Sequence, residues 1–357
     1  MSQTVLLTGI SGFIGLHCAK ELLDAGFKVK GTVRNSTKQQ EVIDVMKSKD
    51  ISIKNLKFVE LDLTSDNGWD KAMKGCECVM HVASPFRIAN PKDEDEMILP
   101  AVEGTKRILK AANKASIKKV ILTSSIVSMM CSIRRGQFGP DDWTDINYPN
   151  LNTYIKSKTL AEKAAWTFID QHKENSKMEL VVIAPGGVFG PPLGNDISGE
   201  SLTVLSKMMN GKIPMVPDTA FPMVDVRDVA KLHVQAILTK DTSGKRFIAS
   251  GTDPIGFADV AEILLKQGYK GPSTKKAPSW LLKFMSFFDR EAKGMLGILG
   301  MRLTADNSNT KKTFNWVPIP FEKSVIQAAN AIKIIQTKQY ITQSTNPSLN
   351  PGPCYMD

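Results

Sequence analysis

Near its start the chain reads Val5-Leu6-Leu7-Thr8-Gly9-Ile10-Ser11-Gly12-Phe13-Ile14-Gly15. The apolar run that opens this stretch is typical of a strand buried in a parallel sheet. Three glycines follow at once, and a helical pattern continues to about Ala25. Glycines between a strand and a helix let the backbone approach a pyrophosphate, and the helix N-terminus attracts the phosphate charge. The stretch therefore predicts the start of a dinucleotide-binding α/β domain.

The rest of the first half alternates short β-rich runs with helical patterns. Further strands are expected at residues 28–33, 56–61, 78–82, 120–123 and 180–184, and further helices near 38–49, 66–74, 97–115 and 153–173. Strands that alternate with helices pair in parallel through right-handed crossovers. The pattern predicts an α/β fold, a Rossmann-type doubly wound parallel sheet followed by a smaller C-terminal domain.

The sequence pattern changes after Pro185, where glycine and proline residues interrupt the regular alternation of strands and helices. Residues 1–184, joined by about 224–243, are expected to form the dinucleotide-binding domain. Residues 185–223 and about 244–335 are expected to form a smaller substrate-binding domain over the carboxyl edge of the sheet. The tail from about 343 to 357 is rich in Ser, Asn and Pro and is expected to be disordered.

Composition excludes several other classes of protein. The net charge is +10, but the basic residues are spread along the chain without a polybasic run, which argues against nucleic acid as a partner. No apolar run approaches the ~20 residues of a membrane span, and the N-terminus lacks a basic signal region. The five scattered cysteines suit a reducing compartment, so we expect a cytoplasmic protein. The histidines show no metal-ligand spacing and no metal is expected: they are His17, His81, His172 and His233.

The end of the second expected strand indicates which dinucleotide is bound. Enzymes that bind NAD usually carry an acidic residue there for the ribose 2′-hydroxyl. This chain instead reads Thr32-Val33-Arg34-Asn35-Ser36-Thr37-Lys38, with no carboxylate. Arg34 and Lys38 are suited to hold a 2′-phosphate. The sequence favours NADP(H), with NAD(H) as the open alternative.

Candidate catalytic side chains stand on a helix and at a strand end. Tyr154 and Lys158 are four residues apart, one turn along the same helix face, whereas Lys156 faces away. An ammonium beside a phenol stabilises the phenolate and lowers its pKa, so the tyrosine can exchange a proton with a substrate oxygen. The strand at 120–123 leads into Ser124 and Ser125, at the edge where open α/β sheets bind ligands, and either hydroxyl can orient a carbonyl there.

The GxxGxxG spacing and the Tyr-Lys pair resemble the extended branch of the short-chain dehydrogenase/reductase superfamily. Residues 32–34, 123–125, 185–191 and 221–230 look most like its dihydroflavonol reductase group. The resemblance covers about residues 4–335 and implies Ser125, rather than Ser124, as the catalytic serine. It implies Asp225 and Asp228 as structural residues. It also implies cofactor contacts by Thr8, Gly9, Gly12, Phe13, Ile14, Gly15, Arg34, Lys38, Asp62, Leu63, Val82, Ala83, Ser84, Thr123, Tyr154, Lys158, Pro185, Gly186 and Val188.

The same resemblance implies NADPH-dependent reduction of an aldehyde or ketone on a fairly hydrophobic substrate. Plant flavonoid enzymes of this group follow the serine with Ala-Gly-Thr-Val and a polar residue that reads ring hydroxyls. This chain has Met130 instead, which argues against a flavonoid substrate. Candidate substrate contacts are Ser125, Phe86, Met130, Phe189 and Phe221, and each of the four apolar side chains is also a candidate for the core.

Two alternatives remain open. The first is a nucleotide-sugar epimerase or dehydratase with tightly bound NAD. Such enzymes use the same Ser, Tyr and Lys but usually have an acidic residue after the second strand. A hydroxysteroid dehydrogenase/isomerase is a related option. A non-catalytic NADP-sensing regulator usually lacks the tyrosine or the lysine, both of which are present here. The expected partner is a small carbonyl or alcohol substrate. No membrane partner is expected, and the protein is expected to be a monomer or a homodimer.

Overall fold

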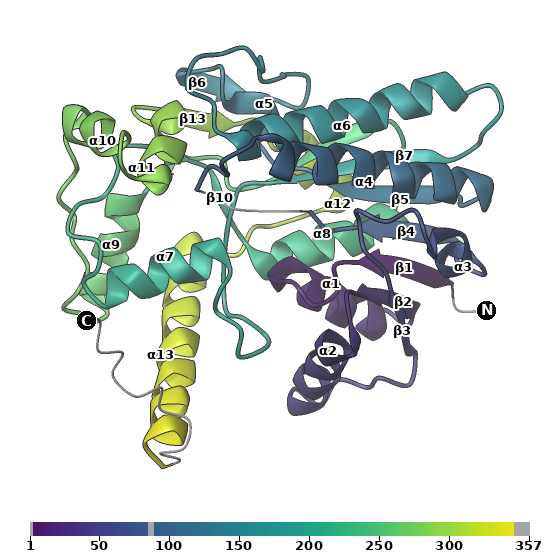
Figure 1. Cartoon of the computed structure of the whole chain (residues 1–357), viewed down its shortest axis with the longest axis horizontal. Helices are drawn as coiled ribbons and strands as arrows, with labels where there is room; N and C mark the ends of the chain where they lie inside the picture. Colours follow the sequence, from purple (N-terminus) through teal and green to yellow (C-terminus); the bar gives the residue numbers. More distant parts are fainter. Residues whose placement is uncertain (1–2, 85–88, 346–357) are drawn as a thin grey trace, which may run out of the picture.

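The computed structural model describes residues 3–84 and 89–345, with only the backbone described at 342–345. Its centre is a seven-stranded parallel sheet (Figure 1) in the order β11-β7-β5-β4-β1-β2-β3. The strands are β1 Thr4–Thr8, β2 Lys28–Val33, β3 Leu56–Glu60, β4 Cys78–His81, β5 Lys119–Thr123, β7 Glu179–Pro185 and β11 Lys245–Ala249. The predicted Rossmann-type sheet is confirmed. The strand order reverses between β1 and β4, the kind of point where such sheets bind ligands.

Helices cover both faces of this sheet, as the alternation of its side chains requires. Leu7 of β1 faces a core shared with α1 Phe13–Asp24, α2 Ser36–Ser48 and α8 Val226–Leu238. Leu6, its neighbour in the strand, faces a core on the opposite side. That second core is shared with α3 Trp69–Met73, α4 Asp95–Lys114 and α6 Thr153–His172. Every helix expected in the first half of the chain is present, with ends that differ by a few residues.

Smaller elements lie beyond the carboxyl edge of the sheet. Helices α7 Glu200–Met209, α9 Phe257–Lys266 and α13 Phe321–Thr345 share a third apolar core, and α5 Val127–Met130 belongs to a fourth. Two small sheets accompany them, ordered β12-β9-β13-β6 and β10-β8. The remaining elements are β6 Arg135–Phe138, β8 Gly187–Phe189, β9 Ala220–Phe221, β10 Met223–Asp225, β12 Ile255–Gly256, α10 Ser279–Met285, α11 Arg290–Met295, the short 3₁₀ helix Leu296–Ile298, β13 Arg302–Ala305 and α12 Ser308–Phe314.

The strand pairing differs from the expected domain boundaries at two places. Residues 245–249 were expected in the smaller domain, but β11 pairs in parallel with β7 and forms the edge of the large sheet. At the start of the stretch 224–243, which was expected in the dinucleotide-binding domain, β10 pairs with β8 and does not join the large sheet. The helix after it, α8, does pack on the large sheet. Of the expected disordered tail, residues 343–345 continue α13, and 346–357 lie outside the described residues.

Within the part of the chain that the structure describes, no helix is long and apolar enough to cross a membrane. The same residues contain no group of three His, Cys, Asp or Glu side chains placed to hold a metal ion.

Candidate active site

The glycine loop forms a tight cradle between β1 and α1. Gly9 has a φ of +70°, and a Cβ on it would lie 2.8 Å from the Cα of Ala83. The Gly12 N–H donates to the Gly9 carbonyl at 3.0 Å, which closes the turn. A Cβ on Gly15 would collide with that same carbonyl. No side chain caps the start of α1, so the N–H groups of its first turn are available to a phosphate. The loop therefore fits the pyrophosphate of a dinucleotide.

The hydroxyl of Thr8, a predicted cofactor residue, joins the end of β1 to the end of β4. Its Oγ1 accepts hydrogen bonds from the backbone N–H groups of Val82 and Ala83, each at 3.1 Å. It also bonds to Nδ1 of His81 at 2.8 Å. Because a hydroxyl has one proton and two lone pairs, these three bonds occupy it fully. Thr8 shapes the cofactor site without offering a free polar group to it.

The candidate phosphate-binding side chains lie at the carboxyl end of β2. Arg34 is exposed at the end of that strand. Lys38, on the first turn of α2, forms a salt bridge with Glu41 at 2.7 Å. Asp62 follows β3 and accepts from the N–H and the hydroxyl of Thr64, which lower the pKa of its carboxyl. Of the two basic side chains, Lys38 already has a salt-bridge partner, whereas Arg34 forms no salt bridge with any described residue. Arg34 is therefore better placed than Lys38 to bind a 2′-phosphate.

The structure brings Ser125 and Tyr154 together. Ser125 lies just beyond β5, and its hydroxyl forms a hydrogen bond with the phenol of Tyr154, the second residue of α6. The hydroxyl of Ser124 points elsewhere, since it donates to the buried carboxylate of Glu162. Lys156 forms a salt bridge with Glu94 at 2.9 Å, away from the tyrosine as expected. The two serines therefore have different partners, Glu162 for Ser124 and Tyr154 for Ser125.

Burial controls the protonation of this site. It raises the pKa of Tyr154 to about 12, although the hydrogen bond from Ser125 opposes the rise. It lowers the pKa of Lys158 to about 8, against the attraction of Glu162. In the protein without cofactor, desolvation of the phenolate outweighs the hydrogen bond from Ser125. Tyr154 is therefore protonated at neutral pH and able to donate.

A buried chain of contacts holds Lys158 in place. Its ammonium donates to the carbonyl of Thr123 at 3.2 Å. The hydroxyl of Thr123 lies 2.7 Å from Nε2 of His233, whose Nδ1 lies 2.7 Å from the carbonyl of Val229. A carbonyl can only accept, so Nδ1 carries the proton and Nε2 accepts from the threonine. His233 thus orients the strand end that anchors the lysine.

The neutral state of His233 predicts a pH-dependent stability. Burial lowers the pKa of His233 from 6.5 to about 4, so the unfolded chain binds a proton between these values that the folded protein does not. The free energy of unfolding therefore falls as the pH drops below 6.5, by about 2 kcal/mol at pH 5 from this group. Urea denaturation of His233→Asn should show a smaller loss between about pH 7 and pH 5 than the wild type. Equal losses would contradict the assignment.

Sequence reasoning missed a buried ion pair behind the catalytic residues. Glu162 of α6 and Arg246 of β11 are 1% and 8% exposed, and Oε1 of Glu162 lies 2.6 Å from Nε of Arg246. Ser128 also donates to the carboxylate, at 2.7 Å. Arg246 stacks on the ring of Trp143 at 3.9 Å. Glu162 lies one helical turn after Lys158. This spacing on one helix face was the feature of the sequence that could have indicated a carboxylate behind the catalytic residues.

The candidate substrate contacts separate into core and boundary residues. Met130 is buried within the core around α5, and Phe189 is buried against Phe321, with ring centroids 5.3 Å apart. Both are core side chains. Phe221 is partly buried and packs on two cores at once, so it remains a candidate for the pocket. Phe86 lies outside the described residues.

The remaining expected contacts lie around the same edge of the sheet. Gly186 follows the end of β7, and a Cβ on it would collide with the carbonyl of Pro222. Val188 is partly buried in β8 and packs against the core that contains α1. Asp225 caps α8 and forms a salt bridge with Arg227 at 2.7 Å, whereas Asp228 accepts from the N–H of Ile319. These two carboxylates have the structural roles that were expected.

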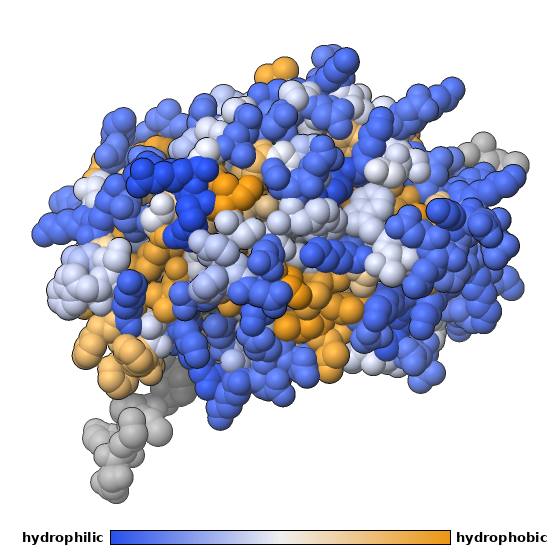
Figure 2. All heavy atoms as spheres, turned by 90° about the horizontal axis from the view of Figure 1, so that it is seen from above, coloured by the Kyte–Doolittle hydropathy of each residue, from blue (hydrophilic) through white to orange (hydrophobic). Residues whose placement is uncertain are grey.

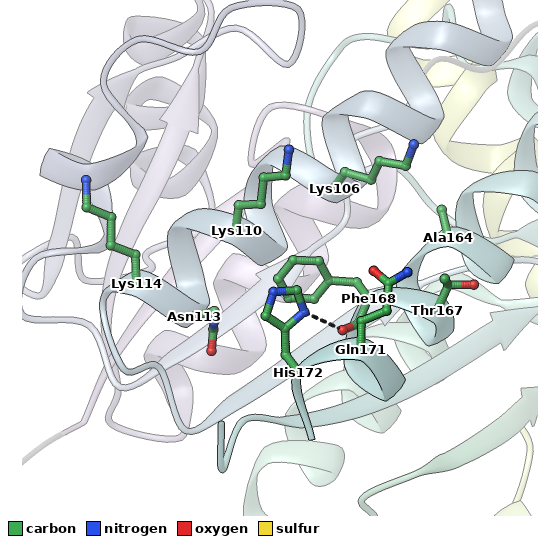
Figure 3. A pocket seen from close by; sticks show the side chains of 9 residues that line it. All are labelled: Lys106, Lys110, Asn113, Lys114, Ala164, Thr167, Phe168, Gln171 and His172. Atoms are coloured by element: carbon green, nitrogen blue, oxygen red, sulfur yellow. Dashed lines mark hydrogen bonds between the residues drawn. The ribbon is translucent and has the colours of Figure 1, made fainter. Parts of the chain in front are cut away.

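A separate surface pocket lies between α4 and α6 (Figure 3). Lysines of α4 line one side, and Phe168 and His172 of α6 lie on the other, with stacked rings 4.1 Å apart. His172 also bonds to the Phe168 carbonyl at 2.8 Å. The lining includes none of the expected catalytic, cofactor or substrate residues, so this pocket is not part of the candidate active site. Its nine residues are Lys106, Lys110, Asn113, Lys114, Ala164, Thr167, Phe168, Gln171 and His172.

Comparison with known proteins agrees with this site. The model of the NAD dependent epimerase/dehydratase family matches residues 5–249. The chain is 30% identical over 286 residues to the NADPH-dependent methylglyoxal reductase of Saccharomyces cerevisiae, covering 73% of this chain and 82% of that protein. It is 34% identical over 271 residues to cinnamoyl-CoA reductase 1 of Arabidopsis thaliana, covering 74% of each.

A solved structure extends the likeness to nearly the whole chain. The crystal structure of yeast methylglyoxal/isovaleraldehyde reductase complexed with NADPH matches with a TM-score of 0.77 at 25% identity, covering 94% of this chain and all of that one. The fold, the glycine loop and these relatives define an oxidoreductase that uses NADP(H). The chain belongs to the NAD dependent epimerase/dehydratase family. The resemblance to dihydroflavonol-reductase-like enzymes is confirmed, and the epimerase alternative is not favoured.

Proposed function

We propose that this protein reduces an aldehyde or ketone on a fairly hydrophobic substrate, with Tyr154 as the proton donor. Bound NADPH supplies the hydride. Ser125 donates a hydrogen bond to the carbonyl oxygen and orients it beside the phenol, and Tyr154 passes its proton to that oxygen as negative charge develops. Lys158 stabilises the phenolate that remains. The contact between Ser125 and Tyr154, on the same carboxyl edge of the sheet as the glycine loop, carries this proposal.

The protonation of the site supports Tyr154 as the proton donor in the reduction. A phenol with a pKa of about 12 keeps its proton at neutral pH and can act as an acid. The proposal includes a cytoplasmic enzyme that acts as a monomer or a homodimer and without nucleic acid. The substrates in the relatives' names, methylglyoxal, isovaleraldehyde and cinnamoyl-CoA, are the first compounds to test.

The experiment is NADPH consumption by the purified protein against these compounds and a wider panel of aldehydes and ketones. NADH is run in parallel. Turnover with NADPH is the expected result. Protein that turns over no carbonyl but carries tightly bound NAD would overturn the proposal in favour of an epimerase or dehydratase.

Arg34 is expected to set the preference for NADPH. Replacing it with alanine removes the guanidinium placed to bind the 2′-phosphate, a charged contact worth about 1.5–3 kcal/mol. The ratio of kcat/KM with NADPH to kcat/KM with NADH should fall by about 10- to 100-fold, through the NADPH value. Lys38→Ala should change the ratio less, because Glu41 already pairs with Lys38. An unchanged ratio in Arg34→Ala would contradict this role.

The two adjacent serines provide a matched pair of variants. Ser125→Ala removes the hydroxyl beside Tyr154 and should lower kcat by about 100-fold or more, since a lost oxyanion donor costs that much. Ser124→Ala removes a hydroxyl that bonds to Glu162 and should mainly lower the free energy of unfolding. Steady-state kinetics and urea denaturation of both variants test the assignment. The opposite pattern would make Ser124 the catalytic serine.

A further inference from the structure

Four aromatic side chains project from one corner of the molecule. Trp280, Phe284, Phe287 and Phe288 are 69%, 59%, 81% and 81% exposed, and we call them the aromatic patch. Trp280 and Phe284 are one turn apart on α10, and Phe288 follows just after it, with its ring 5.7 Å from that of Phe284. At about 150–250 Å² per ring, the patch exposes on the order of 500 Å² of mostly apolar surface. A patch of this size is comparable to the largest apolar patch of a typical monomer, and such patches often mark an interaction site.

The other face of the segment is anchored to the protein. Leu282 and Ala292 are buried, so α10 and α11 are seated by one side while the aromatic rings point outward. Figure 1 places both helices at the left edge of the molecule, and orange surface appears on that side in Figure 2. The aromatic patch is therefore a peripheral, outward-facing surface.

The segment that carries the aromatic patch has an excess of positive charge. Residues 275–293 contain five basic residues and two acidic ones, a net charge of +3. Glu291 pairs with Lys207 at 3.3 Å, and Lys276 pairs with Asp218 at 2.9 Å, so one charge of each sign is offset. Lys283 and Arg290 are exposed and form no salt bridge with any described residue. Two copies of this surface would bring like charges together, whereas an anionic surface would be attracted to it.

We propose that the aromatic patch attaches this protein to the surface of a lipid bilayer that contains anionic lipid. Aromatic rings beside basic side chains suit the boundary between headgroups and acyl chains. The rings enter that boundary, and Lys283 and Arg290 contact the negative headgroups. Attachment of this kind needs no membrane-spanning helix. It revises the expectation that the protein has no membrane partner, and it does not depend on the proposed reaction.

The test is flotation of the full chain with vesicles of phosphatidylcholine alone and of equal parts phosphatidylcholine and phosphatidylglycerol. Wild type should bind the anionic vesicles and bind the neutral ones more weakly. Phe287→Ser with Phe288→Ser should weaken partitioning by about tenfold or more, and Lys283→Glu with Arg290→Glu should do the same. Val317→Ser is the control, because Val317 is an apolar side chain 83% exposed elsewhere on the surface.

Thermal denaturation checks that each variant is folded, which is expected because the changed side chains are exposed. Failure of wild type to bind anionic vesicles would overturn the proposal. Binding that survives both double substitutions would also overturn it. A dimer in sedimentation velocity that Phe287→Ser with Phe288→Ser dissociates would show that a second copy of the chain covers the patch instead.

Discussion

Tyr154→Phe should lower kcat for carbonyl reduction by about 100- to 10,000-fold, the range expected when a general acid is lost. Phenylalanine keeps the ring and its packing but has no proton to give to the developing alkoxide. Because Tyr154 is protonated at neutral pH, the loss should appear in the reduction direction at ordinary pH. The measurement is steady-state NADPH oxidation with a substrate from the panel, together with a binding titration for NADPH.

Tyr148→Phe is the matched control. Tyr148 is a partly buried tyrosine in the loop that precedes α6, and its substitution also removes one phenol hydroxyl. It should keep wild-type kcat. NADPH binding should change little in Tyr154→Phe, so a variant that lost both binding and turnover would indicate a misfolded site. A Tyr154→Phe variant with near wild-type turnover would contradict the proposed role.

Local patterns predicted the elements that carry this site. The helix expected at 153–173 is α6 Thr153–His172, and the strand expected at 28–33 matches β2. Both are amphipathic or buried segments whose periodicity depends only on neighbours in the sequence. The spacing of Tyr154 and Lys158 places them on one helix face for the same reason. Such features can be predicted from the local sequence without knowledge of the tertiary contacts.

Long-range contacts account for what the sequence did not predict. β11 adds to the edge of the large sheet through pairing with β7, about sixty residues earlier in the chain. Its apolar stretch Phe247-Ile248-Ala249 marks a buried strand but does not say which sheet it joins. The hydroxyl of Thr8 is occupied by β4, which follows it by more than seventy residues. Neither partner can be found by periodicity in one strand.

The ion pair of Glu162 and Arg246 is another long-range contact that the sequence did not predict. Its burial predicts that breaking the pair lowers the free energy of unfolding by a large amount. The two residues are 84 positions apart, and Arg246 also donates to the carbonyls of Pro140 and Asp142 at 2.6 Å. Arg246→Met would leave the Glu162 carboxylate buried without its cation. Breaking a buried pair on one side costs about 3–5 kcal/mol, because the remaining charge is uncompensated. Urea denaturation should report a loss of that size.

A second substitution separates the buried charge from the other contacts of the arginine. In Arg246→Met with Glu162→Met, no ionised side chain of the pair remains buried, and part of the lost stability should return. The recovery should be incomplete, since the bonds to the loop at 140–142 and the stacking on Trp143 are still missing. Asp24→Asn in the exposed pair with Lys20 is the control and should cost no more than about 0.5 kcal/mol. If Arg246→Met cost no more than that control, the pair would not stabilise the base of the active site, and Ser124 and Lys158 would be positioned by the helix and strand alone.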